Sequence, residues 1–147
     1  MRTFYEPLEE LAGYERIKDL LAEQGKSVMI SGCIDSEKAH MLNALGQDCQ
    51  CRVVIAHDEA KAREIYDDCR FFNKDTVYYP AKDFIFYSAD VHGNQIVKER
   101  IEAVKRIIEF RNGRRKLSET PGISGTSVAT LTVVTTIDGC ADMLLPV

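Results

Sequence analysis

The clearest fold signal in the chain is CRVVIAHDEAKAREIYDDCRFF, residues 51–72. Residues 51–56 form a short apolar run typical of a buried strand. Asp58 stands where a helix N-cap is expected, and the apolar residues after it recur on one helical side: Ala62, Ile65, Tyr66, Cys69 and Phe72. A strand followed directly by a helix is the repeating unit of α/β proteins.

Further strands and helices are expected on both sides of this segment. Short apolar runs predict strands at residues 27–31, 76–79 and 131–136. Helical periodicity predicts helices at residues 7–23, 35–46 and 94–110, with a short one that Asp138 caps. This alternation predicts an α/β fold with a mainly parallel sheet and helices on both faces. Ligands of such folds bind at the carboxyl ends of the strands, so the loops after Ile30, Ala56 and Tyr79 are the first candidates for chemistry.

Glycine and capping residues predict where these elements are interrupted. Gly13 is expected to split the first helix, and either Asp35 or Ser36 to cap the second. The stretch at about 112–130 is rich in Gly, Ser and Thr and contains Pro121, which predicts a flexible insertion. The length of 147 residues fits one domain, so we expect a single α/β subdomain over residues 1–147.

The composition bounds the class of protein. Hydrophobic residues make up 45% of the chain and charged residues 29%, which is typical of a soluble globular protein and excludes global disorder and fibrous repeats. No apolar run approaches the roughly 20 residues that cross a bilayer, and the first residues do not resemble a signal peptide. An odd number of cysteines, 5, favours reduced thiols. We therefore expect a cytoplasmic protein with no membrane partner.

The charge is unevenly distributed along the chain. The net charge is −4, which argues against a general nucleic-acid binder, but residues 98–116 alone carry +5 and the remainder −9. The residues of this basic strip that we single out as candidate DNA contacts are Lys98, Arg106, Arg111, Arg114, Arg115 and Lys116. The alternative interpretation is a solvated helix surface whose cations favour the helix C-terminus. We expect weak or no direct DNA binding, because the rest of the chain is acidic.

The octapeptide GCIDSEKA, residues 32–39, lies where a phosphate-binding loop of the type G-x-x-x-x-G-K-[ST] is expected. Gly32 and Lys38 match this pattern, whereas Glu37 replaces the second glycine and Ala39 the hydroxyl residue. Glu37 adds bulk and negative charge facing a polyphosphate, and Ala39 offers no oxygen to Mg²⁺. We therefore expect a vestigial loop without bound nucleotide. Lys38 is expected to be neutralised locally by Glu37 or Asp35, or to remain in solvent.

Other chemistry-bearing residues give weaker signals. Residues 57–59, His-Asp-Glu, are compatible with an acidic helicase motif that holds Mg²⁺, but Asp58 and Glu59 also fit as the cap and first turn of a helix, which we favour. Cys49 and Cys51 have no second ligand pair at metal-binding spacing. His40 and His92 have no placed nucleophile. The sequence therefore predicts no catalytic residue and no metal site.

Five collinear segments resemble the start of the bacterial transcription-repair coupling factor family, Mfd. They are residues 30–40 (ISGCIDSEKAH), 58–66 (DEAKAREIY), 79–87 (YPAKDFIFY), 89–94 (ADVHGN) and 133–139 (VVTTIDG). Their order and spacing cover nearly the whole chain apart from the Gly/Ser/Thr-rich stretch. The resemblance implies a UvrB-like first subdomain with a RecA-like three-layer fold and a degenerate nucleotide loop.

The resemblance also implies a function. Proteins of that family are ATP-dependent DNA translocases that displace stalled RNA polymerase and recruit excision-repair proteins. ATP and Mg²⁺ would be bound by motor lobes outside this chain, so no cofactor is implied here. UvrA, RNA polymerase and DNA would be reached through the parent protein, whose other domains are the direct partners. Between Tyr79 and Lys98 the chain is too short for the DNA-inserting aromatic hairpin of UvrB-like proteins.

Two hypotheses follow from the sequence. The first is a non-catalytic structural and interaction module of the coupling factor, and the chain is then a fragment of a longer protein. The second is a stand-alone small doubly wound nucleotide-binding enzyme. Glu37 and Ala39 favour the first.

Overall fold

The computed structural model describes residues 5–23, 25–47, 49–82, 91–118 and 130–141, and within α5 (Val91–Ser118) the side chains of residues 95–113. The chain divides into two compact units, residues 1–48 and 49–147, which are described one at a time. That residues 1–147 form one subdomain stays a prediction.

The described residues of the first unit form three helices, α1 (Glu6–Glu9), α2 (Tyr14–Ala22) and α3 (Asp35–Leu45). Their contacts centre on four buried side chains, Leu8, Tyr14, Met41 and Ala44. The predicted break at Gly13 is confirmed: this residue has φ +93° and precedes α2. Only glycine adopts such a φ readily, so it can end one helix and start the next within a single turn.

The strand predicted at residues 27–31 is wrong. These residues have no strand pairing, and the Met29 side chain is 93% exposed. An apolar run predicts burial, but a strand also needs a neighbouring backbone, which local composition cannot supply. The cap predicted for α3 is wrong as well. Ile34 is the N-cap, without a side-chain hydrogen bond, while Asp35 lies in the first turn, where the helix dipole still favours its charge.

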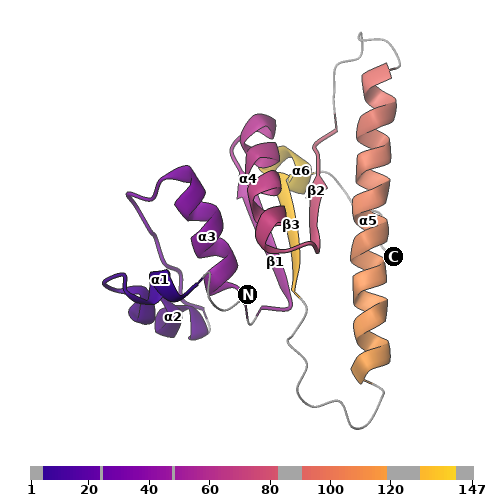
Figure 1. The fold of residues 1–147 in the computed structure, drawn as a ribbon. Helices are drawn as coiled ribbons and strands as arrows, with labels where there is room; N and C mark the ends of the chain where they lie inside the picture. Colours follow the sequence, from indigo (N-terminus) through magenta and orange to yellow (C-terminus); the bar gives the residue numbers. More distant parts are fainter. Residues whose placement is uncertain (1–4, 24, 48, 83–90, 119–129, 142–147) are drawn as a thin grey trace. The chain divides into compact units, whose positions relative to one another are not determined.

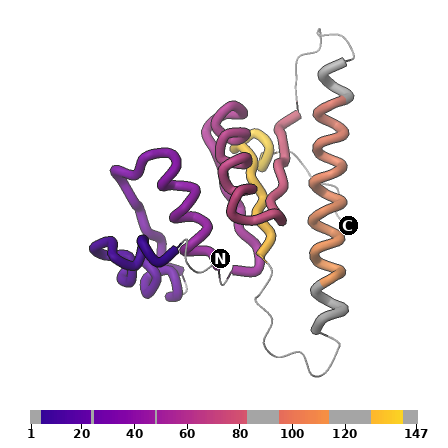
Figure 2. The backbone as a smooth tube through the Cα atoms, in the orientation of Figure 1, coloured from indigo at the N-terminus to yellow at the C-terminus, as the bar shows by residue number. Residues whose placement is uncertain are grey.

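The second unit contains a small open sheet of three parallel strands, β1 (Cys51–Ala56), β2 (Thr76–Tyr79) and β3 (Leu131–Thr136). The strand order is β1-β3-β2, so the last strand in the sequence lies between the other two (Figure 1). Figure 2 shows the same path along the backbone, with the yellow β3 in the centre. Val133 is the register partner of both Val53 and Val77. These strands confirm the predicted α/β class and the parallel sheet.

Two helices cover opposite faces of this sheet. On one face, Ala62 of α4 (Glu59–Phe72) packs against Ala56, Tyr78 and Val134. On the other face, Ala103 of α5 packs against Val77, Tyr79 and Leu131. Successive residues of a strand point to opposite faces, which explains why neighbours such as Val77 and Tyr78 belong to different clusters. Both sides of β2 and β3 are therefore buried.

The strand β1 is less covered than the other two. Val53 is 60% exposed and Ile55 55% exposed, and both belong to the sheet face against which α5 packs. The apolar contacts of α5 are made with β2 and β3. In the described part of the chain, β1 therefore has one uncovered face and one outer edge without a strand neighbour.

The helix α5 is longer than the sequence predicted. It extends from Val91 to Ser118, so the expected flexible insertion at 112–130 is wrong for residues 112–118; residues 119–129 lie outside the described residues. Arg, Lys and Leu are good helix formers, and one Gly costs about 1 kcal/mol relative to Ala, which is too little to end a helix of this length at Gly113. None of the described helices has the length and apolar content needed to span a membrane. The short helix α6 (Ile137–Ala141) follows β3, with Asp138 in its first turn rather than before it.

Candidate functional site

The degenerate loop lies in the first unit, between an irregular segment and α3. Gly32 has φ +87°, and Lys38 lies in the first turns of α3 with its amide donating to the Ile34 carbonyl at 3.0 Å. The Lys38 ammonium donates to the Asp35 carboxylate at 2.8 Å, and both side chains are about half exposed. The prediction that a neighbouring carboxylate neutralises Lys38 is confirmed, with Asp35 as the partner.

The residue after Lys38 is also unsuited to bind a metal ion. Ala39 is buried in the first unit and carries no side-chain oxygen. A hydroxyl placed here by substitution would enter a packed position and would need a hydrogen-bond partner. The remaining first-turn acid, Glu37, adds a second negative charge at the helix start. The loop therefore places two carboxylates beside the Lys38 ammonium, where a phosphate-binding loop offers only amides and an ammonium.

At the carboxyl edge of the sheet in the second unit, Asp58 lies between the end of β1 and the start of α4. The Asp58 carboxylate accepts a hydrogen bond from the Lys61 amide at 2.7 Å and faces the His57 imidazole nitrogen at 3.0 Å. This confirms the interpretation of Asp58 as the N-cap of α4.

The neighbouring Glu59 connects the ends of two other strands. One of its carboxylate oxygens accepts from the Ala81 amide, just after β2, at 2.9 Å, and from the Thr136 hydroxyl, at the end of β3, at 3.3 Å. The Thr136 hydroxyl oxygen in turn accepts from the Gly139 amide at 3.1 Å. Because Glu59 follows β1, this one side chain links the carboxyl ends of all three strands. Its position one residue after the cap was the only sequence signal, and it does not reveal the link.

The basic residues of α5 separate into different environments. Arg100 is buried: its guanidinium donates to the Pro80 carbonyl at 2.6 Å and to the Tyr79 hydroxyl, and lies 4.3 Å from the centre of the Tyr79 ring. It serves the packing of α5 on β2 and is not available to a surface ligand. The charge count over residues 98–116 includes Arg100, because such a count does not distinguish a buried cation from an exposed one.

The six candidate DNA contacts do not form one face. Arg106 donates to the Asp75 carboxylate, which compensates its charge, and Lys98 and Arg111 are exposed. At about 100° per residue, the thirteen steps from Lys98 to Arg111 turn the helix so that these two residues lie roughly 140° apart. Arg114, Arg115 and Lys116 lie in α5, with side chains outside the described ones.

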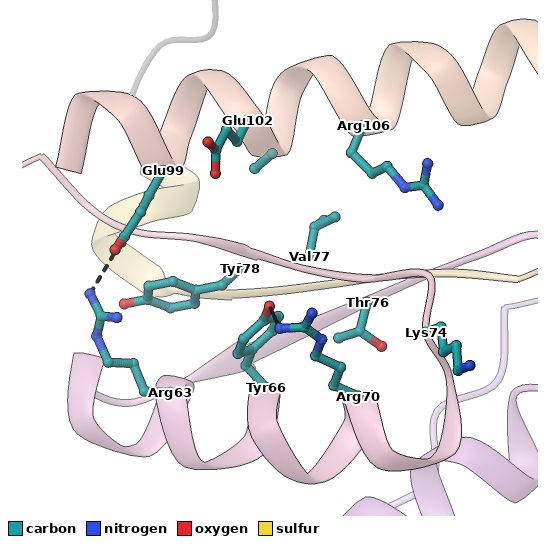
Figure 3. Close-up of a pocket in the computed structure, with 11 residues that line it drawn as sticks. Arg63, Tyr66, Arg70, Lys74, Thr76, Val77, Tyr78, Glu99, Glu102 and Arg106 are labelled. Atoms are coloured by element: carbon teal, nitrogen blue, oxygen red, sulfur yellow. Dashed lines mark hydrogen bonds and ion pairs between the residues drawn. The ribbon is translucent and has the colours of Figure 1, made fainter. Parts of the chain in front are cut away.

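A cleft that the sequence did not predict runs along the outer edge of β2 (Figure 3). Its volume is about 390 Å³, within the range of small ligand sites. Thr76, Val77 and Tyr78 form its floor. Side chains from both helices form its walls: Arg63, Tyr66 and Arg70 from α4, and Glu99, Glu102 and Arg106 from α5. We call this the β2-edge cleft. Its residues come from segments far apart in sequence, so no local pattern could have indicated it.

The thiols and acids give no further site among the described residues. All five cysteines are free, and in the described ranges no three His, Cys, Asp or Glu side chains are grouped to hold a metal ion. Desolvation raises the pKa of the Cys51 thiol above its usual value. A raised pKa lowers the thiolate fraction, which is the opposite of what a nucleophilic cysteine requires.

Comparison of the chain with protein families, with curated proteins and with solved structures found no match.

Proposed function

We propose that this chain is a non-catalytic structural and interaction module of a transcription-repair coupling factor. The single observation that carries the proposal is the Lys38–Asp35 ion pair in the loop where a nucleotide-binding protein would use its lysine on phosphates. The Lys38 ammonium lies beside the Asp35 carboxylate, and Glu37 adds a second negative charge that would repel phosphates. Ala39 has no side-chain oxygen to bind the Mg²⁺ that accompanies ATP. The resemblance of the five sequence segments supplies the family.

The acids at the carboxyl edge of the sheet support the same proposal. Asp58 caps α4, and Glu59 links the ends of β2 and β3. Carboxylates engaged with backbone amides are stabilised as structural groups, and recruiting them to a metal ion would break these contacts. On this proposal the three-strand sheet belongs to a RecA-like three-layer subdomain whose nucleotide site has been lost. The proposal also places the protein in the cytoplasm.

A nucleotide titration tests this proposal. Isothermal calorimetry with ATP and Mg²⁺ is expected to show no binding to the whole chain. The matched variant is Glu37→Gly with Ala39→Thr, which restores both missing pattern positions. It is also expected not to bind, because residues 27–31 form no strand to position the loop and the Asp35 carboxylate remains at the start of α3. Micromolar affinity of the unmodified chain would contradict the proposal and favour the stand-alone nucleotide-binding enzyme.

The proposed partners are the other domains of the parent protein, through which RNA polymerase, UvrA and DNA are reached. Direct DNA binding by this chain is expected to be weak, because the net charge is −4 and Arg100 and Arg106 are engaged. Fluorescence anisotropy with duplex DNA over a range of salt concentrations measures this. Submicromolar, salt-sensitive binding that is lost on reversal of Lys98 and Arg111 would contradict it.

A further inference from the structure

The floor of the β2-edge cleft is an unpaired strand edge. In the described part of the chain, β2 pairs with β3 and has no strand on its other side. The Thr132 amide donates to the Asp75 carbonyl at 2.9 Å, which starts the parallel ladder between the two strands. Alternate residues of a paired strand turn their backbone groups toward the neighbour. The backbone groups of Thr76 and Tyr78 are therefore left on the outer edge, facing the cleft.

The walls close one end of this cleft and leave the other end positively charged. At the Tyr78 end, Arg63 and Glu99 join α4 to α5 through an ion pair of 3.1 Å (Figure 3). At the Thr76 end lie Arg70 and Lys74, and neither pairs with a carboxylate in the described part of the chain. Arg70 is held toward the cleft by a hydrogen bond of 3.0 Å to the Tyr66 hydroxyl.

One residue that lines the cleft, Tyr78, also carries a polar group without a hydrogen-bond partner among the described residues. This group, the Tyr78 hydroxyl, is buried. Buried tyrosine hydroxyls are normally bonded, so this one is an unsatisfied donor and acceptor on a residue that lines the cleft. Figure 3 shows this hydroxyl directed toward the end that Arg63 and Glu99 close.

We propose that the β2-edge cleft binds an extended acidic peptide, which adds to the sheet as a fourth strand beside β2. Strand addition supplies main-chain hydrogen bonds to the outer edge, and an acidic side chain of the peptide pairs with Arg70 and Lys74. A nucleic acid fits less well, because its backbone has no amides and carbonyls to form main-chain hydrogen bonds with the outer edge of β2. This inference rests on the proposed function, since it names the kind of partner that an interaction module would take.

Peptide titration of the whole chain tests the inference. The probe is a fluorescein-labelled heptapeptide, Thr-Val-Glu-Val-Glu-Val-Thr, followed by anisotropy. Two controls have the same length: one has Lys in place of both Glu residues, and the other has N-methylated valines that cannot donate hydrogen bonds. We expect the acidic peptide to bind at least about ten-fold more tightly than either control. Amide NMR signals of Thr76 and Tyr78 are expected to shift on binding and to exchange more slowly with solvent.

Charge reversal locates the site. The double variant Arg70→Glu with Lys74→Glu is expected to lower the affinity for the acidic peptide about ten-fold, because each exposed ion pair contributes up to about 1 kcal/mol. The same variant is expected to bind the Lys peptide more tightly than the acidic one. The matched control is Lys105→Glu, which lies on α5 outside the cleft lining and is expected to leave the affinity unchanged. Thermal melts establish that each variant is folded.

Three affinity results would overturn the inference. They are equal affinities for the acidic and Lys peptides, no binding of the acidic peptide at about 1 mM, where affinity is marginal, and tighter binding of an oligothymidine of similar length. Shifts confined to residues outside the cleft have the same consequence. None of these measurements involves ATP, so the peptide site and the proposed loss of nucleotide binding fail or succeed separately.

Discussion

Replacing Tyr78 by Phe is expected to make the protein more stable. The substitution removes only a hydroxyl, which is buried and has no partner among the described residues. A buried hydroxyl without a hydrogen bond costs about 1–3 kcal/mol relative to its hydrated state in the unfolded chain. The ring stays in its cluster against Ala62 and Val134, and the Arg63 guanidinium, 4.8 Å from the ring centre, keeps an aromatic face beneath it. Allowing for a weaker cation–ring attraction, we expect a gain of about 1 kcal/mol.

The neighbouring tyrosine provides a matched control. The Tyr79 hydroxyl accepts a hydrogen bond from the buried Arg100 guanidinium. Tyr79→Phe leaves that donor one acceptor short and is expected to cost about 1–3 kcal/mol. Urea denaturation followed by circular dichroism measures the free energy of unfolding of both variants, and an unchanged m-value shows that the comparison is valid. A loss of stability in Tyr78→Phe, similar to that in Tyr79→Phe, would refute the reasoning by showing that the Tyr78 hydroxyl is bonded.

Four further substitutions test the roles assigned above. Asp58→Ala removes the cap of α4 and is expected to lower the free energy of unfolding by about 1 kcal/mol in urea denaturation. Arg100→Met leaves a buried carbonyl and a phenol without their donor and is expected to cost about 3 kcal/mol in the same assay. Lys38→Met breaks a half-exposed ion pair and is expected to change stability by less than about 0.5 kcal/mol; a loss above about 2 kcal/mol would indicate a buried charge. Burial raises the pKa of the Tyr14 hydroxyl above its usual value of 10.0. As the pH rises past that value, Tyr14 loses its proton in the unfolded chain first, so the free energy of unfolding falls. Urea denaturation followed by far-ultraviolet circular dichroism from about pH 9 to 11 is expected to show this fall, and Tyr14→Phe is expected to make the fall smaller.

The parts of the fold that depend on local sequence were predictable. The apolar runs at Cys51–Ala56, Thr76–Tyr79 and Leu131–Thr136 became strands, and Asp58 became a cap. In each case the deciding information lies within a few residues: a run of branched apolar side chains, or an acidic residue directly before a helical pattern.

The parts that depend on distant partners were not predictable. Residues 27–31 have the composition of a strand but no pairing neighbour, and the helical segment beyond Phe110 continued through Gly113. The link made by Glu59 and the β2-edge cleft both arise where separate strands and helices meet. A count of the basic residues along α5 could not distinguish the buried Arg100 from the exposed Lys98. The strand against which the helix packs decides which of them is buried.

The central position of β3 has a consequence for synthesis on the ribosome. The strands β1 and β2 do not pair with each other, so neither has a neighbour until β3 has been made. At about 5–20 residues per second, several seconds pass between the translation of Tyr79 and that of Thr136. During this interval the apolar side chains of the two earlier strands are exposed on a nascent chain. Pairings between residues distant in sequence also slow folding, since a long loop must close first. Hydrogen exchange on ribosome-bound chains stopped before and after β3 would show protection of β1 and β2 arising together.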